Sequence, residues 1–450
     1  MHSTAAPALG HCLNIGAKGW ITVSARSLVV CPLNPWPVTS GARQRINLLA
    51  EGLSELGPVD VFHFRGSNAF EPQQVPTWVD RAGSVDKPVP SAAGRAGVIA
   101  AACRAYARGL PRQFGVGRDR RAAAAAAFDR FVGGRHYTVV LVVRQQTLVL
   151  INHLQHVNRD VAVIDVDDLE DDKLRQRRRR LLQMGVRHLP AAALMSVDAA
   201  WWRRLHRRVG TSDAVALVCA DADARKLLRL GVEAAVVPNA FSPVDDALPD
   251  PPKTHHGDAV FVGSPRYRPN RDAVDLLREC IVPAVRAQDA GFQLHVAGGC
   301  NGPPQDGITY HGFVDDLGAM LRPGRLAVLP VLEQTGTSIK VLDSARRGAT
   351  IITTAIAARG LGFVAGRHYL VARTADEFVS AVRHARTHPD HAAEIARNAS
   401  THVLDHYAPD VVRSRFLAVL QRRGLRLSGP SSERRQRSPI DRRPQNWVRS

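Results

Sequence analysis

Residues 326–354 constrain the fold more than any other stretch of the chain. Two short apolar runs, 326–329 and 349–354, each have the length and composition of a strand that is buried on both faces. Between them lie a loop of small polar residues and a helical pattern that ends at Gly348, a residue type that is usual just after a helix. Strand, loop, helix and strand in this order form the repeating unit of a parallel α/β sheet.

The loop at 334–338 has the composition of an anion-binding turn. Thr337 or Ser338 can cap the helix, because a short hydroxyl accepts a hydrogen bond from an amide one turn later. Free amides at a helix start attract an anion. Lys340 and Asp343 are three residues apart and therefore share a helix face, where a cation suits phosphates and a carboxylate suits sugar hydroxyls. The stretch predicts a nucleotide diphosphate site, with an ordinary solvated Lys–Asp pair as the alternative.

The chain contains two series of alternating strands and helices of similar size. A proline-rich segment at 241–257 is the best linker and separates a first series at 26–240 from a second at 258–405. We therefore predict an α/β protein with two doubly wound, Rossmann-like domains that face each other across a central cleft, at the carboxyl ends of their strands. A last amphipathic helix at 406–423 is expected to pack back toward the N-terminal domain.

The N-terminal series begins with a strand, a Pro/Gly loop and a helix. Gly41 in that loop lets the backbone approach a ligand, and Arg43 and Arg45 lie beside it. A plain turn with solvated arginines is the alternative. Residues 66–95 contain four prolines and are expected to be irregular.

Two charged stretches of the same series allow a functional and an ordinary interpretation. Asp165-Val-Asp167 is a pair of hard oxygen ligands that suits a divalent metal, but acidic residues before a helix also complement its dipole. One long basic helix is predicted from 173 to about 208, with four consecutive arginines at 177–180. Its charge fits a solvated face or a contact with anionic lipid.

The net charge of +19 favours anionic partners in general, although part of it is local. The last stretch, from Arg422 onward, contributes +7 and has few apolar residues, so we expect the tail at 424–450 and the lead-in at 1–25 to be disordered. The six cysteines form no close pair and no metal-binding spacing, which favours reduced thiols and a cytoplasmic protein. We expect neither a membrane span nor a signal peptide, and peripheral attachment to the inner membrane face stays open.

Short motifs in the second series resemble the GT-B glycosyltransferases, specifically the large retaining group that builds bacterial polysaccharides and glycolipids (glycosyl transferases group 1). The resemblance covers residues 258–365 well, and it covers the N-terminal half only through its loop and strand pattern. The loop is most similar to that of an exopolysaccharide subset. The motifs are Phe-Val-Gly at 261–263, His-Val-Ala-Gly at 295–298, His-Gly-Phe-Val-Asp at 311–315, Leu-Pro-Val at 329–331 and Gly-Thr-Ser-Ile-Lys-Val-Leu-Asp at 336–343, with Pro238-Asn239, Pro269-Asn270 and Arg359-Gly-Leu361.

The resemblance implies a GT-B fold whose C-terminal domain binds a nucleotide-sugar. Lys340 matches the basic residue that contacts the diphosphate, and Arg266 lies where a second such cation often occurs. Both are the implied catalytic residues. Gly41, with Arg43, matches the N-terminal loop that faces the diphosphate across the cleft. The implied donor-binding residues are Gly336, Thr337, Ser338, Asp343, Gly263 and Gly298.

One departure concerns two glutamates that the family often has eight residues apart. They would fall at 335 and 343, where this chain has Thr335 and Asp343, and Glu333 lies two residues early. Asp343 shortens the reach to the ribose by about one methylene. The implied reaction is transfer from a UDP- or GDP-sugar to a polysaccharide or lipid-linked acceptor, with retention and without a metal or cofactor.

Two other functions remain open from the residues. A sugar-nucleotide epimerase could share the fold, but it needs acid and base groups that the sequence does not place in the cleft. A non-catalytic relative or a nucleic-acid binder would suit the basic charge, yet no interleaving of aromatic and basic residues occurs, so we expect no nucleic-acid partner. No paired carboxylates indicate a glycoside hydrolase.

Overall fold

The computed structural model describes residues 25–66, 75–88, 94–116, 118–151, 154–242, 258–264, 267–299, 302–314 and 317–425. The lead-in and tail predicted at 1–25 and 424–450 lie almost wholly outside these ranges, as does most of the linker predicted at 241–257. Arg266 also lies outside the described residues. Within the described ranges no helix is long and apolar enough to cross a membrane.

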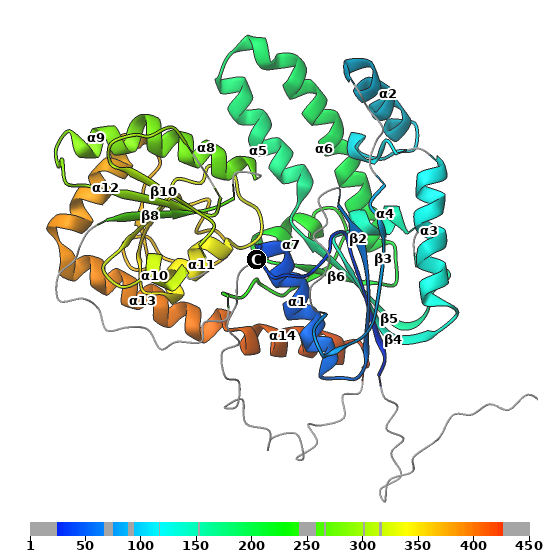
Figure 1. Ribbon diagram of the computed structural model, residues 1–450. Helices are drawn as coiled ribbons and strands as arrows, with labels where there is room; N and C mark the ends of the chain where they lie inside the picture. Colours follow the sequence, from blue (N-terminus) through cyan, green and yellow to red (C-terminus); the bar gives the residue numbers. More distant parts are fainter. Residues whose placement is uncertain are drawn as a thin grey trace, which may run out of the picture.

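Two parallel sheets organise the chain, one in each half (Figure 1). The first has the strand order β3-β2-β1-β4-β5-β6-β7, and all of its pairs are parallel. Its strands are β1 (Ser27–Cys31), β2 (Val59–Arg65), β3 (Val79–Asp86), β4 (His136–Val143), β5 (Asn158–Asp167), β6 (Val215–Val218) and β7 (Ala234–Val236).

The second sheet has the order β10-β9-β8-β11-β12-β13 and is also parallel. The predicted α/β fold with two doubly wound domains is confirmed. Its strands are β8 (Ala259–Val262), β9 (Leu294–Ala297), β10 (Ile308–Gly312), β11 (Leu326–Leu329), β12 (Thr350–Thr353) and β13 (Leu370–Val371).

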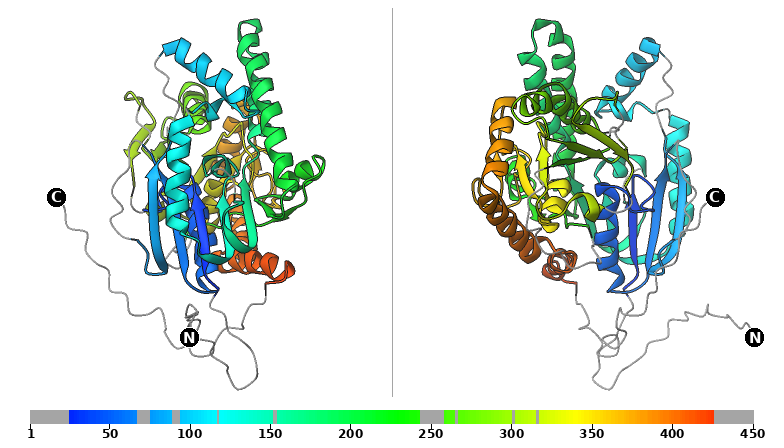
Figure 2. Two further views of the ribbon diagram at one scale, coloured as in Figure 1. Left: turned by 90° about the vertical axis from the view of Figure 1, so that its right-hand side faces the viewer. Right: turned by 60° about the vertical axis from the view of Figure 1, so that its left-hand side comes forward.

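Helices alternate with the strands in both halves and cover the sheet faces (Figures 1 and 2). The first half contains α1 (Gly41–Ser54), α2 (Gly94–Tyr106), α3 (Arg118–Val132), α4 (Gln146–Leu150), α5 (Glu170–Gln183), α6 (Leu189–Gly210) and α7 (Asp221–Leu228). The second contains α8 (Arg268–Leu276), α9 (Val282–Arg286), α10 (Leu317–Met320), α11 (Ile339–Arg346), α12 (Ala375–Thr387), α13 (Pro389–Tyr407) and α14 (Pro409–Arg422).

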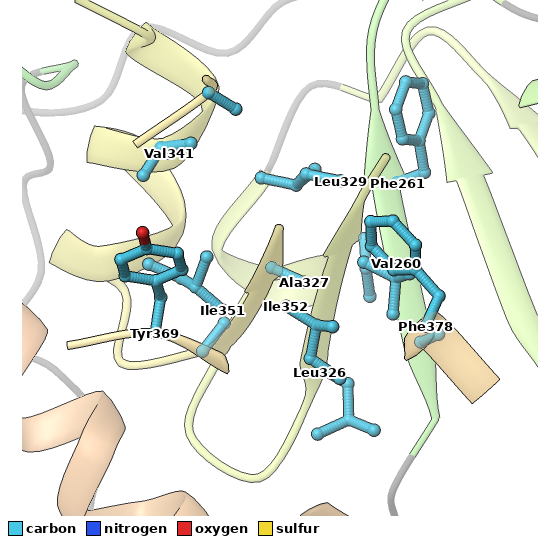
Figure 3. Packing of buried hydrophobic residues seen from close by; sticks show 14 of the residues in the cluster. Val260, Phe261, Leu326, Ala327, Leu329, Val341, Ile351, Ile352, Tyr369 and Phe378 are labelled. Carbon is cyan, nitrogen blue, oxygen red and sulfur yellow. The ribbon is translucent and has the colours of Figure 1, made fainter. Parts of the chain in front are cut away.

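The core of the second domain explains why residues 326–354 fold as predicted. All four residues of β11 and all four of β12 are buried, so helices must cover both faces of this sheet. Val341 from α11 and Phe378 from α12 belong to the cluster that surrounds these strands (Figure 3). Gly348 follows the end of α11 with a positive φ of 71°, which confirms its predicted place after the helix.

The last helix, α14, returns to the N-terminal domain. Phe416 and Leu420 are fully buried in the same cluster as Leu49 and Leu53 of α1. Gly52 permits this packing, because a Cβ at that position would lie 3.3 Å from Cδ1 of Phe416. Although α14 follows the second domain in the sequence, it therefore forms part of the core of the first domain (Figure 1).

Two expectations for the N-terminal half are wrong. Residues 79–86 form an edge strand, not an irregular segment, because they pair with β2 while their side chains alternate between half-buried and exposed. The basic helix expected at 173–208 is a hairpin of two helices, α5 and α6. Gly185 has a φ of 110°, which ends the first helix, and Pro190 suits the first turn of the second.

Candidate active site

The loop between β11 and α11 lies against the N-terminal domain. Gly336 has a φ of 64° and donates its backbone N–H to Oδ2 of Asp223 at 2.8 Å. Thr335 donates its hydroxyl to Oδ1 of Asp168 at 2.9 Å. A Cβ on Gly336 would lie 2.9 Å from that same Asp168 oxygen, so glycine allows the loop to approach the first domain. The predicted anion-binding loop is thus a contact between the two domains.

The hydroxyls of Thr337 and Ser338 do not cap α11, contrary to the sequence expectation. Ser338 occupies the N-cap position without a side-chain hydrogen bond. Thr337 accepts from the backbone N–H of Asn239 at 3.1 Å, and the Asn239 side-chain amide donates to the Thr337 carbonyl at 3.0 Å. Because Asn239 follows the last strand of the first domain, this hydroxyl joins the domains and does not serve its own helix.

Lys340 lies in the first turn of α11 beside the carboxyl end of β8. Its ammonium donates to Oδ1 of Asn270 and lies 4.9 Å from the centroid of the Phe261 ring. Gly263 packs against Asn270, since a Cβ there would lie 2.7 Å from the amide carbon. Gly298 has a φ of 101°, and its Cβ would lie 2.6 Å from the carbonyl oxygen of Gly263. The structure therefore brings Gly263 and Lys340 to Asn270, and Gly298 packs against Gly263 in turn.

Asp343 is buried one turn after Lys340, with 7% of its surface exposed. Both of its carboxylate oxygens accept from Ser242, one from the backbone N–H at 2.7 Å and one from the hydroxyl at 3.0 Å. Arg347 lies 3.8 Å away. Burial raises the pKa of Asp343, and the contacts with Ser242 and Arg347 oppose this effect without cancelling it.

Gly41 and Arg43 lie at the start of α1, on the other side of the domain boundary. A Cβ on Gly41 would come within 2.6 Å of Cδ1 of Ile339, the first residue of α11. The guanidinium of Arg43 donates to the Pro37 carbonyl at 3.0 Å and to the Thr39 hydroxyl at 2.8 Å. Gly41 thus lies directly against α11, whereas Arg43 makes hydrogen bonds within its own loop.

Arg45, which the sequence places beside Gly41 without assigning it to the site, is buried and is not a solvated arginine. It is 2% exposed and donates through two nitrogens to the two oxygens of Asp165, at 2.6 and 2.8 Å. It also donates to the Val237 carbonyl at 3.0 Å. The first aspartate of the Asp-x-Asp pattern is therefore paired with an arginine that is 120 residues away in the sequence.

Asp167, the second aspartate of the pattern, adopts a left-handed backbone with φ 59°, as does Arg144 with φ 61°. The Arg144 guanidinium lies 3.1 Å from the Asp167 carboxylate. Burial acts to raise the pKa of Asp167, but Arg144 and Arg45 lower it below its usual value. In the described part of the chain, no three or more His, Cys, Asp or Glu side chains gather where they could hold a metal ion. These strained residues end β4 and β5, the edge where parallel sheets place ligands.

A comparison with known families identifies the domain that contains the Lys340 cluster. Residues 257–388 match the family described as glycosyl transferases group 1. The chain carries a glycosyl transferases group 1 domain. The match includes Gly263, Gly298, Lys340 and Asp343 and the whole loop between β11 and α11. The predicted enzyme class, a glycosyltransferase, is therefore confirmed. A comparison with curated proteins found no match.

Solved structures resemble the glycosyltransferase over most of its length. Sucrose-phosphate synthase from Thermosynechococcus elongatus has a TM-score of 0.60 at 14% identity, covering 88% of this chain and 98% of that one. Trehalose 6-phosphate synthase from Burkholderia multivorans has a TM-score of 0.57 at 12% identity, covering 89% and 97%. Anabaena HepE in complex with UDP-glucose has a TM-score of 0.56 at 9% identity, covering 88% and 99%. At these identities the likeness shows the fold alone, which is GT-B.

Proposed function

We propose that this glycosyltransferase moves a sugar from a UDP- or GDP-sugar to a polysaccharide or lipid-linked acceptor, with retention of configuration and without a metal. The observation that carries the proposal is the position of Lys340 within the group 1 domain. Lys340 lies in the first turn of α11, and its ammonium contacts Asn270, which packs against Gly263 at the end of β8. A cation at the start of a helix suits a diphosphate, because charge and helix dipole act in the same direction.

Two of the groups that contact Lys340 are neutral, and a diphosphate could displace or join them. Asn270 presents an amide oxygen to the ammonium, while its amide nitrogen donates to the Ser264 carbonyl at 2.9 Å. The Phe261 ring contributes an aromatic face at 4.9 Å. Fixed positive charge at the leaving group stabilises the negative charge that develops as the glycosidic bond breaks. We assign this role to Lys340 and, from the sequence resemblance alone, to Arg266 as a second cation.

Asp343 is assigned to the ribose of the donor. Its two carboxylate oxygens accept from two donors of Ser242, and neighbouring ribose hydroxyls offer the same pair of donors. Gly336, Thr337 and Ser338 connect this point to the diphosphate. In the present arrangement the Gly336 amide donates to Asp223, so donor binding through that amide requires the loop to leave the first domain.

The acceptor is assigned to the N-terminal domain, at the carboxyl ends of its strands. Gly41 brings α1 against α11, and the paired side chains of Arg144 and Asp167 lie at the ends of β4 and β5. Lys87, which is exposed, lies near Arg144 and adds a second cation at this edge. Polar and charged groups in this position suit a carbohydrate acceptor that carries its own phosphate.

Nucleotide binding can be measured directly by thermal unfolding with UDP, GDP, ADP and TDP. UDP is tested first, because HepE, which shares the fold, was solved with UDP-glucose. A nucleotide at 100 times its dissociation constant stabilises the native state by about 2.7 kcal/mol. We expect stabilisation by one base, and its loss in Lys340→Met, because the variant removes the charge and keeps most of the volume.

Arg346→Met is the matched control for that variant. Arg346 lies on the same helix and its guanidinium also lies over an aromatic ring, Phe241, at 5.6 Å. The control should keep the nucleotide response of the wild type. If no nucleotide stabilises the wild-type chain, the proposal that it binds a nucleotide-sugar donor is wrong.

Product analysis separates transfer from the other reaction that the fold could support. Transfer releases a free nucleotide diphosphate, whereas an epimerase leaves a changed sugar on its nucleotide. The same assay, repeated with EDTA, tests metal independence, and the anomeric proton signals of the product test retention. An EDTA-sensitive reaction or an inverted product would contradict that part of the proposal.

A further inference from the structure

The hairpin formed by α5 and α6 projects beyond the body of the molecule (Figures 1 and 2). We define its tip as residues 182–197. Six of the fifteen exposed large hydrophobic side chains in the described part of the chain belong to this tip. They are Leu182 (42% exposed), Met184 (58%), Val186 (81%), Leu189 (51%), Leu194 (37%) and Val197 (44%). Apolar side chains concentrated in this way indicate an interaction surface.

The charges around the tip have one sign. No Asp or Glu occurs between Asp172 and Asp198, while this interval contains seven cations. Asp198 itself is buried and paired with Arg112 and the Tyr106 hydroxyl, so it does not offset the positive charge of the tip. The cations are Lys173, Arg175, Arg177, Arg178, Arg179, Arg180 and Arg187.

These cations differ in exposure and in partners. Arg177 and Arg180 are half-buried and pair with Glu333 of the second domain, at 3.4 and 3.1 Å. Arg179 and Arg187 are exposed, the latter within the tip itself. Apolar side chains at the end of a projection, with exposed arginines beside them, match the order of layers in an anionic bilayer surface, where acyl chains lie under charged headgroups.

We propose that the tip of this hairpin inserts into the surface of an anionic lipid bilayer, with Arg179 and Arg187 at the headgroups. The exposed apolar groups belong to the end of α5, the turn after it and the first turns of α6, whereas a stable protein interface needs a broad complementary surface. The bilayer is therefore the partner that this shape and charge fit best.

The same hairpin contacts the loop that precedes α11. Gln176 of α5 exchanges two hydrogen bonds with the backbone of Gln334, each at 3.1 Å. A 14-residue helix such as α5 is about 21 Å long, so an inserted tip would hold this loop within about 20 Å of the bilayer surface. A lipid-linked acceptor, if the proposed transfer uses one, would then lie within reach of the proposed donor site at the start of α11.

Vesicle sedimentation with the full chain tests the proposal. The vesicles are made of phosphatidylcholine alone or of an equimolar mixture with phosphatidylglycerol. We expect binding to the anionic vesicles and weak binding to the neutral ones. The triple variant Met184→Ser, Val186→Ser, Leu189→Ser should bind about tenfold more weakly or worse, because it removes the inserting groups. Its matched control is Val364→Ser, Leu404→Ser, which changes two exposed apolar residues elsewhere.

A charge series distinguishes insertion from adsorption through general positive charge. Arg187→Glu should weaken anionic binding more than Arg415→Glu, which changes an exposed arginine on α14. Equal effects of both variants, or vesicle binding that the triple variant leaves unchanged, would overturn the proposal. So would a failure of the wild type to bind either kind of vesicle.

Sedimentation velocity of the same proteins tests whether the tip is instead a self-association surface. A wild-type dimer that becomes a monomer in the triple variant would make the tip an interface between copies and would contradict the lipid assignment. Circular dichroism and the melting temperature check that the variants are folded. Vesicle binding needs neither donor nor acceptor, so its failure would leave the proposed transfer to be judged by its own test.

Discussion

Ser242 donates to both carboxylate oxygens of Asp343, through its backbone N–H at 2.7 Å and its hydroxyl at 3.0 Å. Ser242 follows the last strand of the first domain, and Asp343 belongs to the helix that opens the proposed donor site. The carboxylate assigned to the ribose is therefore already satisfied by the chain itself. Donor binding at Asp343 must exchange these hydrogen bonds for those of the ribose.

This competition predicts that Ser242→Ala binds the donor nucleotide more tightly. The variant removes one of the two hydrogen bonds that the ribose must replace, and a hydrogen bond to a charged group contributes about 1.5 kcal/mol, so we expect the dissociation constant to fall by about tenfold. Isothermal titration of the nucleotide measures the change. Ser344→Ala is the control, because Ser344 donates to the Lys340 carbonyl within its own helix. Weaker or unchanged binding in Ser242→Ala would argue that Asp343 serves the domain contact alone.

The raised pKa of Asp343 predicts a distinct pH dependence of stability. Burial raises the pKa above its ordinary value of 3.8, so the folded chain holds this proton more tightly than the unfolded chain. The free energy of unfolding therefore falls as pH rises from about 3.8 through the raised folded pKa. Asp343→Asn cannot ionise and lacks this loss, so its melting temperature should improve relative to wild type as pH rises from about 3.8 through the raised folded pKa.

The exposed Asp376→Asn variant provides the comparison for that pH series. Its melting temperature should follow the wild type more closely across the same range. A constant offset between Asp343→Asn and wild type at every pH would show that the Asp343 carboxylate titrates alike in the folded and unfolded chains.

The buried pair of Arg45 and Asp165 predicts a large asymmetry between single and double substitutions. Both side chains are almost wholly inaccessible. Arg45→Met therefore leaves the buried Asp165 carboxylate without its guanidinium, and Asp165→Leu leaves Arg45 with Asp167 at 3.8 Å as its remaining acidic partner. Breaking such a pair costs about 3–5 kcal/mol, whereas replacing both partners by apolar residues often costs far less. We expect the double variant to be more stable than either single variant in urea unfolding. Additive losses would mean that the two residues act through separate contacts.

The sequence located the second domain well because its signals are local. The apolar runs of β11 and β12, the small loop between them and Gly348 all lie within one stretch of the chain, so their pattern specifies strand, turn and helix directly. The edge strand β3 was missed because half of its residues face solvent and its pairing with β2 has no apolar signature.

The contacts that join the domains could not be predicted in the same way. Arg45 and Asp165 are 120 residues apart, and Thr337 and Asn239 are 98 apart, so no periodicity or spacing connects them. The hydroxyl of Thr337 had a plausible local use as a helix cap, and the tertiary contact with Asn239 took precedence. The sequence thus identified which residues lie on α11 and its loop but not the partners that hold them.

Gly41 and Ile339 give the last prediction, which concerns the spacing of the two domains where α1 meets α11. A methyl group on Gly41 would lie 2.6 Å from Cδ1 of Ile339, the residue directly before Lys340. Gly41→Ala should therefore displace the start of α11 and lower kcat/KM, at an overpacking cost of about 1–3 kcal/mol. Ile339→Val deletes the clashing atom, so the double variant Gly41→Ala, Ile339→Val should recover most of the loss in a double-mutant cycle. If the double variant is as impaired as Gly41→Ala, the glycine is needed for a contact other than the one with Ile339.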